Sequence, residues 1–217
     1  MAEETFRIQM DGSQSVTATR VRPDGEPAGW TFIYAPGAGS NIHDPFGRKL
    51  SAQFAAKGIE VIRFQFPYAE AKRRLPDRTP VLEATWTAAI SQSRRPDTKL
   101  AVGGRSMGGR IASQVVAGGE EVDALILFAY PLHPPDQPGN LRTKHLPDIA
   151  APTLFISGTQ DEFGTPDELA TAIALVRGAR LHRLEGANHG FGPVKGIGRA
   201  KEDIEEEALG AAMEFLQ

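Results

Sequence analysis

The pattern of apolar and polar positions predicts strands that alternate with helices. Short apolar runs recur along the chain, and those near residues 30–35 and 124–128 are almost continuous, as in strands buried on both faces. Between them, apolar residues return every third or fourth position, as on one face of a helix. This alternation predicts an α/β fold with a doubly wound, mainly parallel sheet. The expected strands of this sheet are 30–35, 59–64, 99–103, 123–129, 153–157 and 180–184.

The N-terminal part follows a different pattern. Residues 5–9 and 15–21 alternate in polarity around Asp11-Gly12-Ser13, which predicts a β-hairpin. We expect its two strands to be antiparallel and to lie at an edge of the sheet.

Capping residues mark the ends of several helices. Asp44 and Thr79 are expected to act as N-caps, each followed by proline at the first helical position, and Gly58 is expected to end the first of these helices. Thr165 and Glu168 form the pattern of a capping box. A last helix is predicted from about residue 200 to 216. The proline-rich segment 131–152 is too short and broken for a second domain, so we expect one domain over residues 1–217.

The segment 99–113 carries the chemistry around which the other elements are arranged. A short apolar strand leads into Gly104-Arg105-Ser106-Met107-Gly108, and a helix with small residues follows. This order is the one required by a nucleophile elbow, in which a serine projects from a sharp turn between strand and helix. Glycines two positions before and after Ser106 suit the crowding of such a turn. An ordinary glycine-rich connection is the alternative interpretation.

Two further polar residues follow the ends of later strands. Asp161 comes after the strand at 153–157, and His189 comes after the last strand, between Gly186 and Gly190. Since the carboxyl ends of parallel strands share one edge, we expect both to lie near Ser106. A serine hydroxyl needs an imidazole to accept its proton and a carboxylate to orient that imidazole. The sequence therefore predicts a catalytic triad of Ser106, His189 and Asp161.

Other residues compete for these roles. Asp161 could instead be a turn residue, while Asp167 and Asp123 are better explained as a first-turn acid and a residue at a strand start. His133 is the second choice for the base, and His43 is expected to line the pocket or cap the next helix.

Two backbone amides are candidates for stabilising a tetrahedral oxyanion. The N–H of Met107 lies at the start of the elbow helix, where it can point at developing negative charge. A second donor is expected from the loop 36–39, which follows a strand; we assign it to Ala38, with Gly37 and Gly39 as alternatives. The loop lacks the glycine spacing and the lysine of phosphate-binding motifs.

Composition excludes several classes of function. The net charge of −3 and pI near 6.0 give no basic footprint for nucleic acid. There is no cysteine for a disulfide, thiolate metal site or nucleophile, no metal-ligand spacing, and no apolar run of membrane-spanning length. The start of the sequence is acidic and lacks the apolar region of a signal peptide, so a cytoplasmic protein is expected. The basic doublets Arg73-Arg74 and Arg94-Arg95 are interpreted as surface residues, although the first could favour an anionic substrate.

The motifs around the three candidate residues resemble those of the α/β-hydrolase superfamily. The resemblance extends over essentially the whole chain. The nearest likeness is to small members without a lid, of the dienelactone-hydrolase-like kind and a related bacterial branch. Dienelactone hydrolases use a cysteine nucleophile, which this chain lacks, and Pro36-Gly37 stands where many relatives have His-Gly. The resemblance implies an α/β-hydrolase fold with no cap domain and an open site.

The expected function is that of a serine hydrolase acting on small-molecule carboxylic esters or thioesters, with no cofactor. A peptidase or acyl transferase would use the same residues. The alternative from another class is a catalytically idle domain that serves as a binding or scaffold module.

Overall fold

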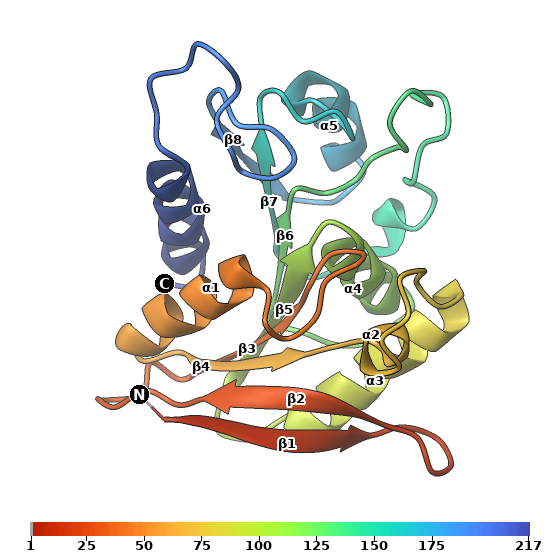
Figure 1. Ribbon diagram of the computed structural model, residues 1–217, viewed down its shortest axis with the longest axis vertical. Helices are drawn as coiled ribbons and strands as arrows, with labels where there is room; N and C mark the ends of the chain where they lie inside the picture. Colours follow the sequence, from red (N-terminus) through yellow and green to blue (C-terminus); the bar gives the residue numbers. More distant parts are fainter. Residues whose placement is uncertain (1) are drawn as a thin grey trace.

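A single eight-stranded sheet forms the centre of the protein in the computed structural model, which describes residues 2–217 (Figure 1). Met1, the first residue of the acidic start, lies outside the described residues. The strand order is β1-β2-β4-β3-β5-β6-β7-β8. The strands are β1 (Glu3–Gln9), β2 (Ser15–Val21), β3 (Trp30–Ala35), β4 (Glu60–Phe64), β5 (Lys99–Arg105), β6 (Ala124–Phe128), β7 (Thr153–Gly158) and β8 (Arg180–Leu184).

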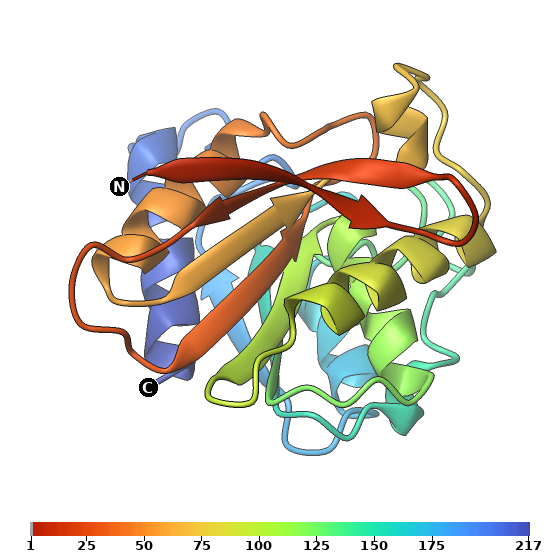
Figure 2. The ribbon, with the colours of Figure 1, turned by 90° about the horizontal axis from the view of Figure 1, so that it is seen from below.

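The pairing confirms a mainly parallel sheet that carries an N-terminal antiparallel hairpin. From β4 through β3 to β8 every neighbouring pair is parallel, whereas β1 pairs antiparallel with β2, and β2 with β4. The prediction that both hairpin strands lie at the edge was wrong for β2. Residues 18–21 of β2 pair with β4, so only β1 is an edge strand, and the hairpin crosses the lower end of the molecule (Figures 1 and 2).

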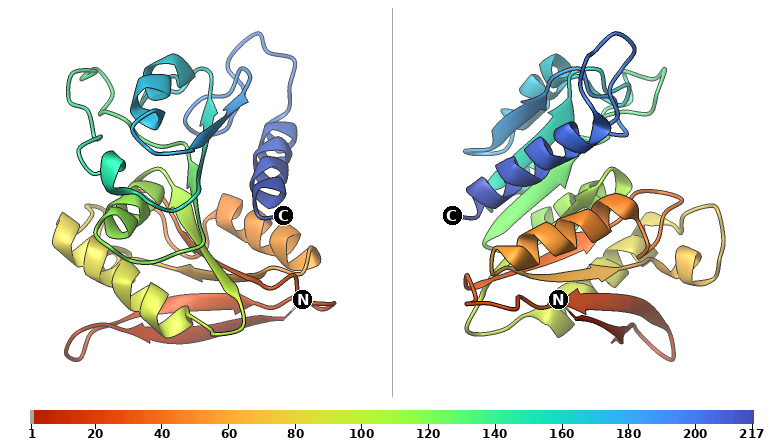
Figure 3. Two further views of the ribbon diagram at one scale, coloured as in Figure 1. Left: turned by 180° about the vertical axis from the view of Figure 1, so that it is seen from behind. Right: turned by 60° about the vertical axis from the view of Figure 1, so that its left-hand side comes forward.

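Helices cover both faces of the sheet. α1 (Pro45–Ala56) and α6 (Lys201–Phe215) lie on one face, and α3 (Thr79–Ser93), α4 (Met107–Ala117) and α5 (Pro166–Ile173) on the other (Figures 1 and 3). Each face has its own apolar cluster. Phe46, Phe54 and Ile204 belong to the first, Trp86 and Ile111 to the second, and all five are buried. The sheet is therefore buried on both sides, as its apolar strands predicted.

The starts of α1 and α3 can be compared with the predicted N-caps. Asp44 caps α1 as predicted, because its carboxylate accepts a hydrogen bond from the Gly47 N–H at 3.0 Å. The N-cap of α3 is Arg78, not Thr79, and the Arg78 side chain makes no capping hydrogen bond. The carbonyl of Arg78 already accepts from the Leu82 N–H, so the helix begins one residue early and Thr79 lies within its first turn.

The connections differ from expectation in one place. The predicted loop 65–78 contains a short helix, α2 (Pro67–Glu70). The proline-rich segment 131–152 forms no cap domain and holds only a 3₁₀ turn, Leu146–Asp148. A single domain over residues 1–217 stays a prediction. No helix within residues 2–217 combines the length and the apolar character needed to cross a bilayer.

A carboxylate in α2 ties the N-terminal hairpin to the rest of the fold. Glu70 accepts hydrogen bonds from the Thr17 N–H at 3.0 Å and from the Gln65 amide at 2.6 Å, and it pairs with the Arg7 guanidinium. Burial alone would raise the pKa of Glu70, but these hydrogen bonds lower it from its ordinary value of 4.5 to about 2.

This pairing predicts acid-sensitive anchoring of the hairpin. A carboxylate whose pKa is depressed by folding adds stability above its unfolded pKa, and the contribution is lost as pH falls from about 4.5 to about 2. Glu70→Gln should therefore lower the free energy of unfolding at pH 7 by about 1–2 kcal/mol. The variant should also lose less stability than the wild type between these two pH values. Urea unfolding at several pH values measures both effects, and parallel pH curves for the two proteins would contradict the assignment.

Candidate active site

Ser106 lies at the turn between β5 and α4 in a strained backbone conformation. Its φ of 50° and ψ of −118° are rarely adopted by residues other than glycine. The turn is closely packed against the end of β3: a Cβ at Gly104 would lie 2.4 Å from the Ala35 carbonyl oxygen, and one at Gly108 only 2.3 Å from it. The two glycines of the motif are thus required by sterics, and the geometry is that of a nucleophile elbow.

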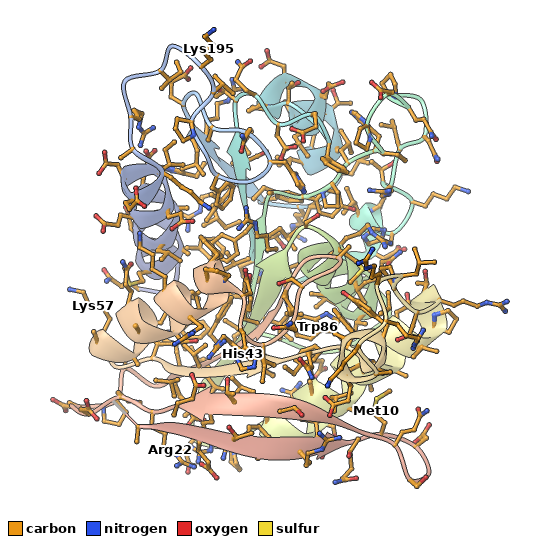
Figure 4. All side chains as sticks on the ribbon, in the orientation of Figure 1. Met10, Arg22, His43, Lys57, Trp86 and Lys195 are labelled. Carbon is orange, nitrogen blue, oxygen red and sulfur yellow. The ribbon has the colours of Figure 1, made fainter. Side chains whose placement is uncertain are left out.

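The helix behind the elbow is held from a second direction. Trp86 of α3, labelled in Figure 4, is fully buried and donates its indole N–H to the Gly108 carbonyl at 3.1 Å. Since Gly108 lies in the first turn of α4, this bond links α3 to the backbone just after Ser106.

The structure brings the three predicted residues together. The His189 Nε2 lies 2.8 Å from the Ser106 Oγ, and its Nδ1 lies 2.9 Å from both carboxylate oxygens of Asp161. Asp161 is fully buried, and the His189 side chain is 16% exposed. A carboxylate at Nδ1 favours the tautomer with hydrogen on Nδ1, which leaves Nε2 free to accept the serine proton.

Two loops carry the histidine and the carboxylate, and their backbones are joined. The Gln160 N–H donates to the Ala187 carbonyl at 2.9 Å, and a Cβ at Gly158 would lie 2.2 Å from the same oxygen. The histidine loop is closed by Asn188, which bonds to Gly192 through both its backbone N–H and its side-chain oxygen. The His189–Asp161 geometry therefore rests on a rigid pair of loops.

Phe163 contacts both Asp161 and His189, although the sequence did not indicate a role for it. Its backbone N–H donates to Asp161 Oδ1 at 2.8 Å, which supplies a further partner to the buried carboxylate. Its ring lies over the His189 imidazole, with centroids 4.1 Å apart and planes inclined by 31°. One residue thus constrains both members of the pair. Its position two residues after Asp161 was the only sequence signal.

Arg105 is a second residue that supports the site and was not predicted from the sequence. Its guanidinium lies between the rings of Phe46 and Phe191, at 5.3 and 5.1 Å from their centroids, and donates to the His189 carbonyl at 3.2 Å. The residue before Ser106 is thereby connected to the backbone of His189. The only sequence evidence for this role was the position of Arg105 inside the serine motif, in which only the other residues had been given a role.

The predicted oxyanion donors lie beside Ser106. Met107 and Ala38 line the same pocket as Ser106, and a Cβ at Gly37 would lie 3.6 Å from the Ser106 Cβ. Gly39 is a poorer choice for the second donor because its N–H already donates to the Tyr68 hydroxyl at 3.1 Å. Within residues 2–217, neither the Met107 nor the Ala38 amide has a protein acceptor.

The competing histidines lie elsewhere. His133 is buried, with Nδ1 at 2.8 Å from the Pro134 carbonyl and Nε2 at 3.5 Å from Glu168. His43, labelled in Figure 4, is exposed on the loop before α1, which Asp44 caps in its place.

The competing acids also have structural roles away from Ser106. The exposed Asp167 pairs with Arg183 at 3.2 Å, and Asp123 accepts from the Leu100 N–H at 2.7 Å near the start of β5. In the part of the chain that the structure describes, no group of three or more His, Asp or Glu side chains is placed to hold a metal ion.

The basic doublets belong to the surface, as interpreted from the sequence. Arg73 is 52% exposed and pairs with Asp77, and Arg95 is 47% exposed and lies 3.5 Å from Glu60. Arg94 donates to the Glu121 carbonyl, and Arg74 is exposed.

Among the curated proteins that match the chain, one is similar to a short part of it. Polyketide synthase ThaQ from Burkholderia thailandensis is 43% identical over 47 residues, which are 22% of this chain and 2% of that protein. The chain thus spans only a small fraction of the length of this relative.

Solved structures match over the whole length. An alpha-beta serine hydrolase homologue from Coxiella burnetii has a TM-score of 0.79 at 20% identity, covering 97% of this chain and 98% of its own. Dienelactone hydrolase from Anabaena variabilis has a TM-score of 0.74 at 22% identity, covering 100% of this chain and 99% of its own. The model of a family described as an alpha/beta hydrolase domain matches residues 28–217. This protein therefore belongs to the alpha/beta hydrolase family that its motifs resemble.

Proposed function

We propose that the protein hydrolyses carboxylic esters or thioesters through an acyl-enzyme intermediate on Ser106. The observation that carries this proposal is the continuous chain of hydrogen bonds from Ser106 Oγ through His189 to the buried Asp161. A catalytically idle binding module would have no need for an aligned hydroxyl, imidazole and carboxylate, so this alignment favours catalysis over the scaffold alternative.

In the acylation step, the Ser106 Oγ attacks the carbonyl carbon while its proton passes to His189 Nε2. Asp161 stabilises the imidazolium that forms, since its carboxylate is buried beside Nδ1. The tetrahedral intermediate then collapses and expels the alkoxide or thiolate, which takes the proton from Nε2. Ser106 is left bound to the acyl group.

The negative charge on the carbonyl oxygen needs preorganised donors. We assign the backbone N–H groups of Met107 and Ala38 to this role, because both lie beside Ser106 and neither donates to another protein group within residues 2–217. Donors of this kind are worth roughly 10²–10³-fold in kcat. In the second half of the reaction, water loses a proton to His189 and attacks the acyl carbon. The second tetrahedral intermediate then collapses: its bond to the Ser106 Oγ breaks, Oγ takes the proton from His189 Nε2, and the carboxylic acid leaves.

The first test is covalent labelling of the purified protein with a fluorophosphonate probe, with the labelled residue identified by peptide mass spectrometry. The label is expected on Ser106, and Ser106→Ala and His189→Ala should each lose it, since the serine is a poor nucleophile without the imidazole. Turnover of matched ester, thioester and amide substrates then identifies the bond that is cleaved. Labelling of His189→Ala at the wild-type rate, or no label on Ser106, would refute the proposal.

A second test removes the charge of Asp161 and keeps its shape. Asp161→Asn should lower kcat by roughly 10³–10⁴-fold, because an amide in place of the carboxylate favours the wrong imidazole tautomer. Steady-state hydrolysis of a 4-nitrophenyl ester measures the effect. A loss below about tenfold would mean that Asp161 does not orient His189.

Arg105 is expected to act as a positioning residue. Arg105→Met keeps much of the apolar stem but removes the hydrogen bond to the His189 carbonyl and the charge between the two rings. We expect kcat to fall by about tenfold with little change in KM, because a histidine held less tightly meets the serine less often. Arg105→Lys should restore part of the activity.

The control for this test is Arg177→Met, which removes an exposed positive charge at a distance from the site. A loss of thermal stability in Arg105→Met with kcat intact would show that Arg105 only supports the fold.

A further inference from the structure

The pocket at Ser106 has a cationic wall. Its volume is about 240 Å³, and its lining includes Ser106, Met107 and Phe163 together with two arginines, Arg110 and Arg142. Arg110 lies on α4, four residues after the nucleophile, and Arg142 comes from the segment that follows β6. The two residues approach the pocket from separate parts of the chain.

Neither guanidinium is neutralised by a carboxylate. Arg110 donates to the side-chain oxygen of Gln114 at 3.2 Å, and Arg142 donates to the Pro131 carbonyl at 3.0 Å, so both partners are uncharged. Among residues 2–217, no Asp or Glu oxygen forms an ion pair with either one. Glu83 acts on Arg110 only from beyond ion-pair distance.

The one acidic residue that lines the pocket is already engaged. Asp77 accepts from the Tyr68 N–H at 2.7 Å and pairs with the Arg73 guanidinium outside the pocket. His145, close to Arg110, adds no charge, because burial and the Arg110 charge lower its pKa to about 4. The pocket therefore holds two positive charges with no unpaired negative charge to balance them.

This arrangement is unfavourable without an anion. Burial lowers the pKa of both arginines, and for Arg110 the nearby Arg142 charge lowers it further, yet a guanidinium stays protonated at neutral pH. Two partly buried like charges repel each other. A planar carboxylate accepts paired hydrogen bonds from a guanidinium and would remove this repulsion.

We propose that Arg110 and Arg142 bind a carboxylate on the substrate, so that the preferred substrates are esters or thioesters that carry a second, ionised carboxyl group. This inference rests on the proposed reaction at Ser106 and specifies its substrate class. The binding group lies in the same pocket as the nucleophile, which requires the carboxylate to be a few bonds away from the scissile carbonyl.

The experiment compares charged and neutral esters of the same shape. In the first pair, mono(4-nitrophenyl) adipate carries the carboxylate on the acyl side, and 4-nitrophenyl hexanoate is its neutral counterpart. In the second pair, 4-acetoxybenzoate carries the carboxylate on the leaving group, and its methyl ester is the neutral counterpart. In at least one pair, kcat/KM for the charged ester should be about 10–100-fold higher, as for charge-assisted hydrogen bonds. A preference for the neutral ester in both pairs, or no preference, would overturn the proposal.

Variants locate the origin of the preference. Arg110→Gln and Arg142→Gln should each reduce the charged-to-neutral ratio of kcat/KM by about tenfold. Arg142→Lys should retain part of it, because the charge stays but the planar fork is lost. Arg74→Gln removes an equal charge from the exposed doublet nearby and should leave the ratio as in the wild type. A ratio that falls equally in Arg74→Gln would assign the preference to the overall field of the surface.

The same measurements distinguish a failure of the proposed carboxylate site from a failure of the proposed reaction at Ser106. If neutral esters are cleaved and Ser106 is labelled but no ratio exceeds one, the carboxylate site fails and the hydrolase stands. If neither ester is cleaved and Ser106 is not labelled, the proposed reaction fails first.

Discussion

Below Ser106, the backbones at Ala35, Gly104 and Gly108 approach one another so closely that a single added Cβ would lie within 2.4 Å of a carbonyl oxygen. This contact joins the end of β3, the end of β5 and the start of α4. It fixes the strained turn that carries Ser106, and it places the loop with Ala38 beside that serine. The fold and the site therefore share one steric condition, and a residue larger than glycine at either position would disturb both.

A second condition is electrostatic. Asp161 is buried completely, and a buried carboxylate is costly unless it is hydrogen-bonded and paired. The His189 imidazole and the Phe163 N–H supply those partners, and the backbone bond between Gln160 and Ala187 keeps the two loops together. The contacts that satisfy the carboxylate also orient the His189 imidazole toward Ser106, so the local stability of this region and the alignment of the three side chains have the same origin.

Periodicity and capping were sufficient to predict the strands and the longer helices in their order along the chain, because parallel buried strands leave long apolar runs, but they did not reveal the short helix α2. The meeting of Ser106, Asp161 and His189 followed from the rule that the carboxyl ends of such strands share an edge. Arg105 and Phe163 were missed because their roles depend on distances between loops that are remote in sequence. The inner position of β2 was missed because alternation reveals which face is buried but not how many neighbours a strand has.

The segment between β6 and β7 contains only a 3₁₀ turn, Leu146–Asp148, so within residues 2–217 it adds no α-helix or strand beside the Ser106 pocket. An acyl group held on that serine would remain in contact with the surrounding solution. Water is then the most abundant acceptor, and an added alcohol or amine would compete with it according to its concentration and its nucleophilicity. The partition of the acyl group between hydrolysis and transfer would therefore depend on the composition of the medium.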